Sequence, residues 1–166
     1  MKVLVVYDSV FGNTEKIAQA IGGALAAGND AATLRVNDVK LEQLKGINLL
    51  IIGSPTRGFR PTEGITNFLQ SIPGNSLNGI PVAAFDTRLK ADESSFLTRL
   101  VLKGGYAAKT IANLLVKNGG NLVTPPEGFF VKDREGPLKD GELERAAAWA
   151  GKIASLVSYQ LMEQER

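Results

Sequence analysis

The sequence predicts an α/β fold: a doubly wound, five-stranded parallel sheet with helices on both faces. Short apolar runs alternate along the chain with segments whose apolar residues recur at helical spacing. The runs Val3–Tyr7, Leu49–Gly53 and Val82–Phe85 are apolar at nearly every position. Parallel strands covered by helices on both faces have this composition. Ligands of such sheets bind beyond the carboxyl ends of the strands, so we expect the functional site there.

The other two strands are less regular. We expect a strand at Ala32–Val36 and a fifth strand within Asn121–Val131. Pro125 and Pro126 have no backbone N–H to donate to a neighbouring strand, which indicates a bend or a sheet edge in the fifth strand.

Four helices are expected between and after the strands. An apolar stripe from Ile17 to Leu25 predicts the first, ending near Gly28, and Thr62 is the expected N-cap of the second. The third contains Ile111, Leu114 and Leu115. The last runs from about Leu143 to Leu161, with Leu143 on its packing face and Trp149 at the edge of that face. Residues 38–44 are expected to form one or two helical turns.

Composition narrows the possible functions. The 166 residues suffice for one domain, and the chain contains neither cysteine nor histidine. This excludes thiol nucleophiles, imidazole chemistry and Cys/His metal sites, so we expect a bound cofactor to supply the reactive group. The net charge of +2 is too small to indicate a nucleic-acid partner. Asp8 interrupts the first apolar run, so we expect neither a membrane span nor a signal peptide, and a cytoplasmic protein.

The junction of the first strand and first helix has the features of an anion site. The loop Ser9-Val10-Phe11-Gly12-Asn13-Thr14 offers backbone N–H groups, two hydroxyls and a helix N-terminus. It lacks the glycine spacing of dinucleotide folds and the lysine of nucleoside triphosphatases. We therefore expect a phosphate monoester such as that of FMN. The alternative is a plain turn in which Thr14 caps the helix.

Three segments carry a resemblance to a known family. The stretch YDSVFGNTEKIAQAI resembles the phosphate loop of flavodoxins, GSPTRGFRP resembles the loop that covers the flavin, and AAFDTR resembles the segment at its pyrimidine edge. The resemblance implies the strand order 2-1-3-4-5 and bound FMN, with no metal and no catalytic residue of the chain's own. It implies phosphate binding by Ser9, Val10, Phe11, Gly12, Asn13 and Thr14, ring contacts from Pro55, Thr56, Arg57, Gly58 and Phe59, and polar-edge contacts from Asp86, Thr87 and Arg88. By the same resemblance, the Gly58 peptide is expected to rotate and stabilise the one-electron-reduced flavin.

The sequence departs from the family pattern in its aromatic residues and its charge. The stacking tyrosine usual after strand four is missing, which leaves Phe59 close to the flavin, and we expect Phe96 and Tyr106 to pack in the core. Arg57, Arg60, Arg88 and Lys90 fall on the expected flavin rim, where flavodoxins are typically acidic. We therefore expect raised potentials and partners with acidic docking surfaces. The connection from Phe129 to Leu138 is long enough to overhang the site.

Three functions are compatible with these features. The favoured one is a one-electron carrier between a reductase and an acceptor protein, active as a monomer or weak homodimer. The second is an FMN oxidoreductase that uses NAD(P)H to reduce a quinone or similar acceptor, with Arg57 and Arg88 holding the anionic substrate. The third is a flavodoxin-like regulatory module without FMN.

Overall fold

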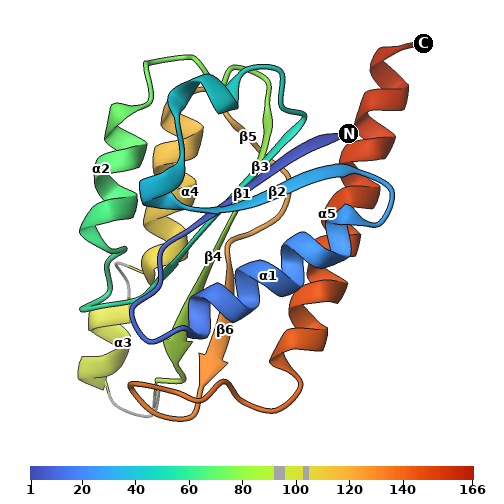
Figure 1. Ribbon diagram of the computed structural model, residues 1–166. Helices are drawn as coiled ribbons and strands as arrows, with labels where there is room; N and C mark the ends of the chain where they lie inside the picture. Colours follow the sequence, from blue (N-terminus) through green and yellow to red (C-terminus); the bar gives the residue numbers. More distant parts are fainter. Residues whose placement is uncertain (92–95, 103–104) are drawn as a thin grey trace.

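The computed structural model of the chain describes residues 1–91, 96–102 and 105–166. Its centre is a parallel sheet with the order β2-β1-β3-β4-β5, in which β6 also pairs with β4 (Figure 1). The strands are β1 (Lys2–Tyr7), β2 (Asp30–Arg35), β3 (Leu49–Pro55), β4 (Pro81–Leu89), β5 (Asn121–Leu122) and β6 (Glu127–Val131). The predicted doubly wound sheet and its strand order are confirmed.

The fifth position of the sheet is divided between two short strands. β5 pairs with the beginning of β4, at Pro81 and Val82, whereas β6 pairs with its end, from Phe85 to Leu89. Pro125 and Pro126 lie in the break between them. Because proline has no N–H to donate, the ladder stops there and resumes after the bend, as the sequence indicates.

Helices cover both faces of the sheet. The described helices are α1 (Asn13–Ala26), α2 (Glu63–Ser71), α3 (Phe96–Leu102), α4 (Ala107–Lys117) and α5 (Glu142–Gln164), and the short 3₁₀ turns are η1 (Val36–Asp38) and η2 (Leu41–Leu44). α1 and α5 lie on one face, and α2 and α4 lie on the other (Figure 1). Thr62 is the N-cap of α2, since its side chain accepts a hydrogen bond from the backbone N–H of Ile65.

The core on the α1 and α5 face contains an aromatic cluster. The rings of Phe85, Phe129 and Trp149 contact one another edge to face, with centroids 6.0–6.2 Å apart. Trp149 is therefore in the core and not at its edge, and Leu143 is 42% exposed, contrary to expectation. Burying the large Trp149 side chain against Phe85 and Phe129 outweighs burying Leu143, so α5 is rotated toward the indole.

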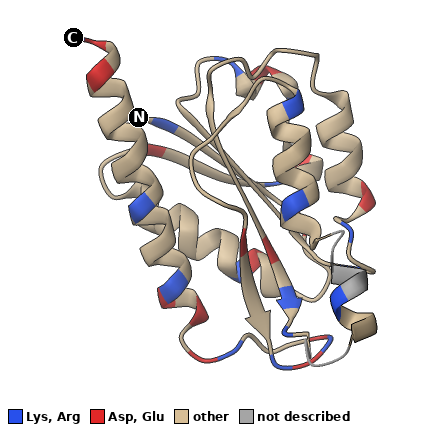
Figure 2. Ribbon diagram, turned by 180° about the vertical axis from the view of Figure 1, so that it is seen from behind, with Lys and Arg blue, Asp and Glu red and all other residues tan. Residues whose placement is uncertain are grey.

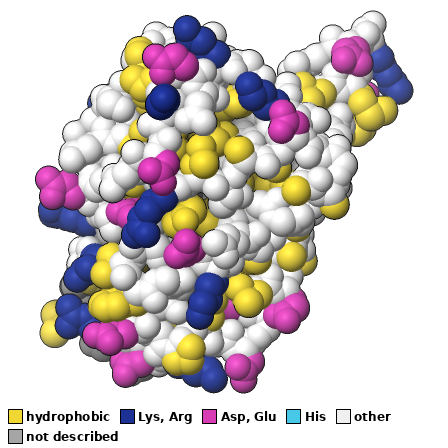
Figure 3. Space-filling model, viewed as in Figure 1, with side chains coloured by type: hydrophobic (Ala, Val, Ile, Leu, Met, Phe, Trp, Pro, Cys, Tyr) yellow, Lys and Arg dark blue, Asp and Glu magenta, His cyan; other side chains and the backbone are white. Residues whose placement is uncertain are grey.

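The opposite face is closed by aliphatic residues of α2 and α4. Ile65 and Leu69 of α2 and Ile111 and Leu115 of α4 are buried over the sheet. The last turns of α5 project beyond the body of the molecule (Figure 3). In the described ranges, no helix has the length and apolar character needed to cross a membrane.

Candidate functional site

A cavity of about 590 Å³ opens at the carboxyl ends of the strands. Four chain segments line it, each beginning at or just after the end of β1, β3, β4 or β6, and Tyr106 adds to it from the start of α4. The lining residues are Val10, Phe11, Asn13, Thr14, Pro55, Thr56, Arg57, Gly58, Phe59, Thr87, Arg88, Leu89, Ala91, Tyr106, Val131 and Arg134. All of the predicted site residues belong to this set except Ser9, Gly12 and Asp86.

The loop after β1 presents backbone N–H groups at the cavity. Gly12 adopts φ +89° and is the N-cap of α1, so α1 begins immediately beside the cavity. Among the N–H groups of Ser9–Thr14, the hydrogen bonds within the described part of the chain leave four without an acceptor, those of Val10, Phe11, Asn13 and Thr14. These amides and the positive end of the α1 dipole form a concave donor surface for an anion.

Ser9 and Gly12 shape this loop from behind. The Ser9 side chain is buried, and its Oγ accepts hydrogen bonds from the backbone N–H groups of Gly12 (3.1 Å) and Glu15 (3.4 Å). Ser9 was expected to bind the phosphate; it does not line the cavity, and its Oγ holds the loop in its turn. The positive φ of Gly12 is readily accessible only to glycine. This backbone conformation accounts for a glycine at position 12, although the residue does not line the cavity.

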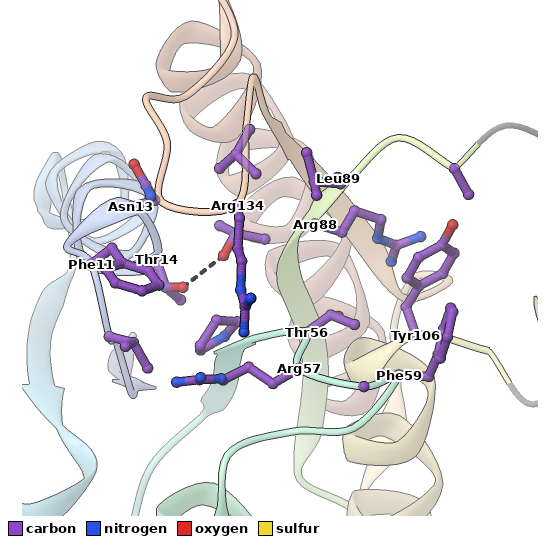
Figure 4. Close-up of a pocket in the computed structure, with 16 residues that line it drawn as sticks. Phe11, Asn13, Thr14, Thr56, Arg57, Phe59, Arg88, Leu89, Tyr106 and Arg134 are labelled. Carbon is purple, nitrogen blue, oxygen red and sulfur yellow. Dashed lines mark hydrogen bonds between the residues drawn. The ribbon is translucent and has the colours of Figure 1, made fainter.

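Thr14 is not the helix cap of the alternative interpretation. It is the second residue of α1, and its Oγ1 lies 2.7 Å from Oγ1 of Thr87 at the end of β4. Figure 4 shows this hydrogen bond at the wall of the cavity. The pair joins the loop after β1 to the end of β4, so two segments far apart in sequence keep a constant spacing.

The loop after β3 forms a tight turn. The backbone N–H groups of Arg57 and Arg60 each donate to the carbonyl of the other, at 2.9 and 3.1 Å. Gly58 (φ +54°) and Phe59 (φ +64°) occupy its two central positions. Two positive φ values with this bonding match a type I′ turn. Gly58 adopts this conformation easily, whereas Phe59 holds its aromatic ring at the cavity in a strained backbone.

Asp86 lies beneath the cavity and not on it. The carboxylate is fully buried and accepts two hydrogen bonds from Arg88, at 2.6 and 2.8 Å, and one from the backbone N–H of Ala108, at 2.9 Å. Burial raises the pKa of Asp86 above its ordinary value, although Arg88 opposes that shift. Asp86 was expected at the polar edge of a flavin. The structure assigns it to orienting Arg88 and to fixing the start of α4.

Tyr106 is a site residue that sequence reasoning placed in the core. The Arg88 guanidinium lies 3.7 Å from the centre of its ring, and the Phe59 ring lies 6.0 Å away. Tyr106 is half-buried in the cavity wall, and Phe96 is 68% exposed, so neither packs in the core. Tyr106 is at the N-cap of α4, and only the packing of α4 on β3 and β4 reveals its position.

The connection after β6 overhangs the site, as expected from its length. Val131 and Arg134 line the cavity opposite the loop after β3. Figure 4 shows the Arg134 side chain extending into the cavity between Thr14 and Arg88. Arg134 was missed because its sequence context is that of an ordinary charged turn.

The positive charge at the rim comes from a different set of residues than the sequence indicates. The guanidinium of Arg88 is neutralised by Asp86, and Arg57, Arg60 and Lys90 are exposed. Figure 2 shows acidic as well as basic positions at the end of the sheet where the cavity lies. One of the four expected rim cations is therefore paired, whereas Arg134, which was not expected at the site, adds a positive charge to the cavity.

A family model described as a flavodoxin domain matches residues 4–129 of this chain. The chain belongs to the flavodoxin family. A flavodoxin of Clostridium beijerinckii is 34% identical over 84 residues, which span 49% of this chain and 60% of that protein. An archaeal flavodoxin structure superposes with a TM-score of 0.76 at 26% identity, covering 95% of this chain and 99% of its own. Flavodoxin 2 of Bacillus cereus superposes with a TM-score of 0.75 at 24% identity, covering 93% and 99%.

The cavity of this flavodoxin-family chain has a donor set that fits FMN. Members of the family typically bind FMN. The unpaired amides after β1 match a phosphate monoester, because they donate hydrogen bonds without requiring a lysine. The volume of about 590 Å³ lies within the range of small-molecule and cofactor pockets.

Proposed function

We propose that this chain is an FMN-dependent electron carrier that passes single electrons between redox proteins. The observation that carries the proposal is the set of backbone N–H groups without an acceptor at Val10, Phe11, Asn13 and Thr14, four residues that line a cavity at the end of the sheet. Electron transfer is also the function that membership of the flavodoxin family suggests. The flavin would supply the redox chemistry, and the protein would bind and orient it.

The residues of the cavity divide into two groups under this proposal. The loop after β1 would hold the phosphate, since its amides and the N-terminus of α1 attract an anion. The turn at Arg57–Arg60, together with Thr87, Leu89 and Tyr106, would surround the ring. Phe59 and Tyr106 supply aromatic surface, and the Thr14–Thr87 hydrogen bond keeps the phosphate and ring regions at a constant separation.

Surface features support a protein partner. Val10, Phe11, Phe59 and Leu89 line the cavity and are each between 39% and 48% exposed. Apolar side chains around a cofactor opening provide a contact surface for a transient complex. Redox partner proteins, their acidic docking surfaces, a monomeric or weakly dimeric state and a cytoplasmic location all belong to this proposal.

One observation favours the second candidate, an NAD(P)H-dependent oxidoreductase. The side chain of Arg57 lines the cavity, and no acidic residue of the described ranges forms an ion pair with it. A guanidinium in this position suits the phosphate of a nicotinamide nucleotide. The other arginine expected to hold this substrate, Arg88, is occupied by Asp86, which weakens the candidate.

Reconstitution with FMN tests the proposal. We expect apoprotein to bind FMN with 1:1 stoichiometry, followed by quenching of flavin fluorescence. Anaerobic stepwise reduction, with and without NADH or NADPH, then separates the functions. Reduction in two one-electron steps without oxidation of the pyridine nucleotide supports the carrier. Direct two-electron reduction by NAD(P)H supports the oxidoreductase, and failure to bind FMN rejects both in favour of the regulatory module.

A further inference from the structure

Residues 130–139 form a short hairpin between β6 and α5. The backbone N–H of Lys132 donates to the carbonyl of Pro137 at 2.8 Å, and that of Lys139 donates to Phe130 at 2.9 Å. The N–H of Gly136 donates to Asp133 at 2.9 Å and closes the tip. This 130–139 hairpin is therefore an ordered element with Arg134 in its tip.

The base of the 130–139 hairpin is held by charged hydrogen bonds. Glu142 accepts from the backbone N–H of Phe130 at 2.7 Å and forms an ion pair with Arg145 at 2.7 Å. Arg145 also contacts Glu127 at 3.2 Å. These bonds connect β6, the hairpin and α5, so the hairpin has little freedom to swing away from the cavity.

The tip of the hairpin is attached to the loop after β1. Nδ2 of Asn13 donates a hydrogen bond of 3.0 Å to the carbonyl of Glu135, the residue next to Arg134. A Cβ atom at Gly136 would lie 2.7 Å from the side-chain amide of Asn13, so the hairpin backbone packs directly against that side chain. Asn13 thus holds Arg134 beside the same loop that presents the unpaired N–H groups.

Two guanidinium groups extend into the region beside this loop. In Figure 4, Arg134 extends from the hairpin past Thr14, and Arg57 extends toward the same region from the loop after β3. Both line the cavity, and neither forms an ion pair with an acidic residue in the described portions of the chain. Like charges aimed at one region repel each other unless an anion is bound between them.

We propose that Arg134 is a phosphate ligand of the cofactor and that the 130–139 hairpin is a clamp over the phosphate. The inference rests on the proposed function, because it assigns the phosphate to FMN. The loop after β1 has no basic residue, so its amides donate hydrogen bonds to a phosphate but bring no formal positive charge. The planar guanidinium of Arg134 would supply the missing positive charge and donate hydrogen bonds to the phosphate oxygens.

The test compares FMN with riboflavin, which lacks the phosphate. Apoprotein of the full chain is titrated with each flavin, and the dissociation constants are obtained from flavin fluorescence. We expect R134Q to weaken FMN binding about tenfold, as for the loss of one partly exposed charged hydrogen bond. Riboflavin binding should be unchanged, R134K should retain part of the FMN affinity, and added salt should weaken FMN binding less in R134Q than in the native protein.

Lys132→Gln is the matched control. It removes one positive charge from the same hairpin, but Lys132 pairs with Asp140 and does not line the cavity. We expect K132Q to leave the ratio of FMN to riboflavin affinity unchanged. An equal decrease in K132Q and R134Q would show a general charge effect and overturn the proposal.

The two proposals can fail separately. If FMN binds and R134Q keeps the native ratio of affinities, the phosphate clamp is wrong and the proposed function stands. If the native protein binds neither flavin, both are wrong. Thermal unfolding of each variant, followed by circular dichroism, verifies that the altered affinities come from folded protein.

Discussion

The Asp86–Arg88 pair shows how a single buried charge can organise the cavity wall. Asp86 has no exposed surface and Arg88 is largely buried. Burying either charge without the other would therefore lower the free energy of unfolding. Arg88 in turn lies on the ring of Tyr106. A carboxylate that does not reach the cavity therefore determines the position of two residues that do.

We expect Arg88→Met to lower the free energy of unfolding by about 3 kcal/mol at pH 7, because the Asp86 carboxylate loses its partner. Burial raises the pKa of Asp86 and Arg88 lowers it, so removing Arg88 raises this pKa further. At pH values between the ordinary carboxyl pKa and the raised pKa of Asp86, the folded state binds more protons than the unfolded state. The free energy of unfolding therefore falls as the pH rises through this range. The deficit should be largest at pH 7 and shrink toward pH 4, as measured by urea unfolding.

Two variants check this explanation. D86N/R88M should recover most of the loss, because no buried charge remains. Arg60→Met removes an exposed arginine of the same rim and should change stability little. A deficit in R88M that is independent of pH would contradict the role of Asp86.

Phe59 illustrates strain retained at a site. Its φ of +64° disfavours a bulky side chain, yet its ring lines the cavity beside Tyr106. Such conformations persist where the surrounding structure requires them and function benefits from the side chain.

Phe59→Asn is expected to keep or raise the stability of the apoprotein, by up to about 1 kcal/mol, since asparagine tolerates positive φ. FMN affinity should fall about tenfold, since the aromatic surface against the ring is lost. Denaturant unfolding and FMN titration measure the two effects. Phe96→Asn, at an exposed aromatic residue outside the cavity lining, should leave FMN affinity unchanged. Unaltered FMN binding in F59N would show that the ring does not contact the flavin.

The 130–139 hairpin is the element whose position depends most on a close approach between distant segments. Gly136 has φ +106°, and a Cβ there would meet the side chain of Asn13, which is itself buried. The contact can be relieved only by moving Asn13 or the hairpin tip, and either movement breaks the Asn13–Glu135 hydrogen bond.

Gly136→Ala should therefore lower stability by about 2 kcal/mol and also weaken FMN relative to riboflavin. Gly141→Ala is the control, because Gly141 has φ +84° but open space around its Cβ position. It should cost about 1 kcal/mol through backbone strain alone and leave the affinity ratio unchanged. Thermal unfolding and flavin titration measure both properties. Equal affinity ratios in the two variants would argue against the clamp.

At the scale of the whole molecule, one sheet connects every segment of the site. The loops after β1, β3, β4 and β6 meet because their parallel strands end at the same edge. The aromatic cluster around Trp149 joins β4, β6 and α5 below this edge. We therefore expect the chain to unfold as a single cooperative unit.

FMN at about 100 times its dissociation constant should add roughly 2.7 kcal/mol to the free energy of unfolding, because it binds only the folded state. This corresponds to a rise in Tm of about 5–10 °C. Thermal scans followed by far-ultraviolet circular dichroism and by Trp149 fluorescence should give one coincident transition. Separate transitions would show independent domains, and an unchanged Tm would contradict FMN binding.

The sequence was sufficient to predict the sheet and four of the five described helices, but not α3, and with the resemblance to flavodoxins it predicted most of the cavity lining. Apolar runs identify β1, β3 and β4 because a parallel strand buried on both faces tolerates few polar residues. The loop Ser9–Thr14 is recognisable because two hydroxyls and a glycine stand between a strand and a helix N-terminus, whereas the turn at Gly58 was predicted from the resemblance to flavodoxins. These features depend on neighbours along the chain.

Tertiary structure alone decided the remaining features. Asp86 lies below the cavity, where its carboxylate accepts a hydrogen bond from the backbone N–H of Ala108 in α4, and Tyr106 reaches the cavity because α4 packs on β3 and β4. Arg134 enters the site because Asn13, more than one hundred residues earlier, holds the hairpin tip. The sequence by itself determined which segments form the site. Contacts between residues far apart in the sequence decided which side chains face the interior of the site. The energies of such contacts depend on the packed structure, so a local sequence pattern does not predict them.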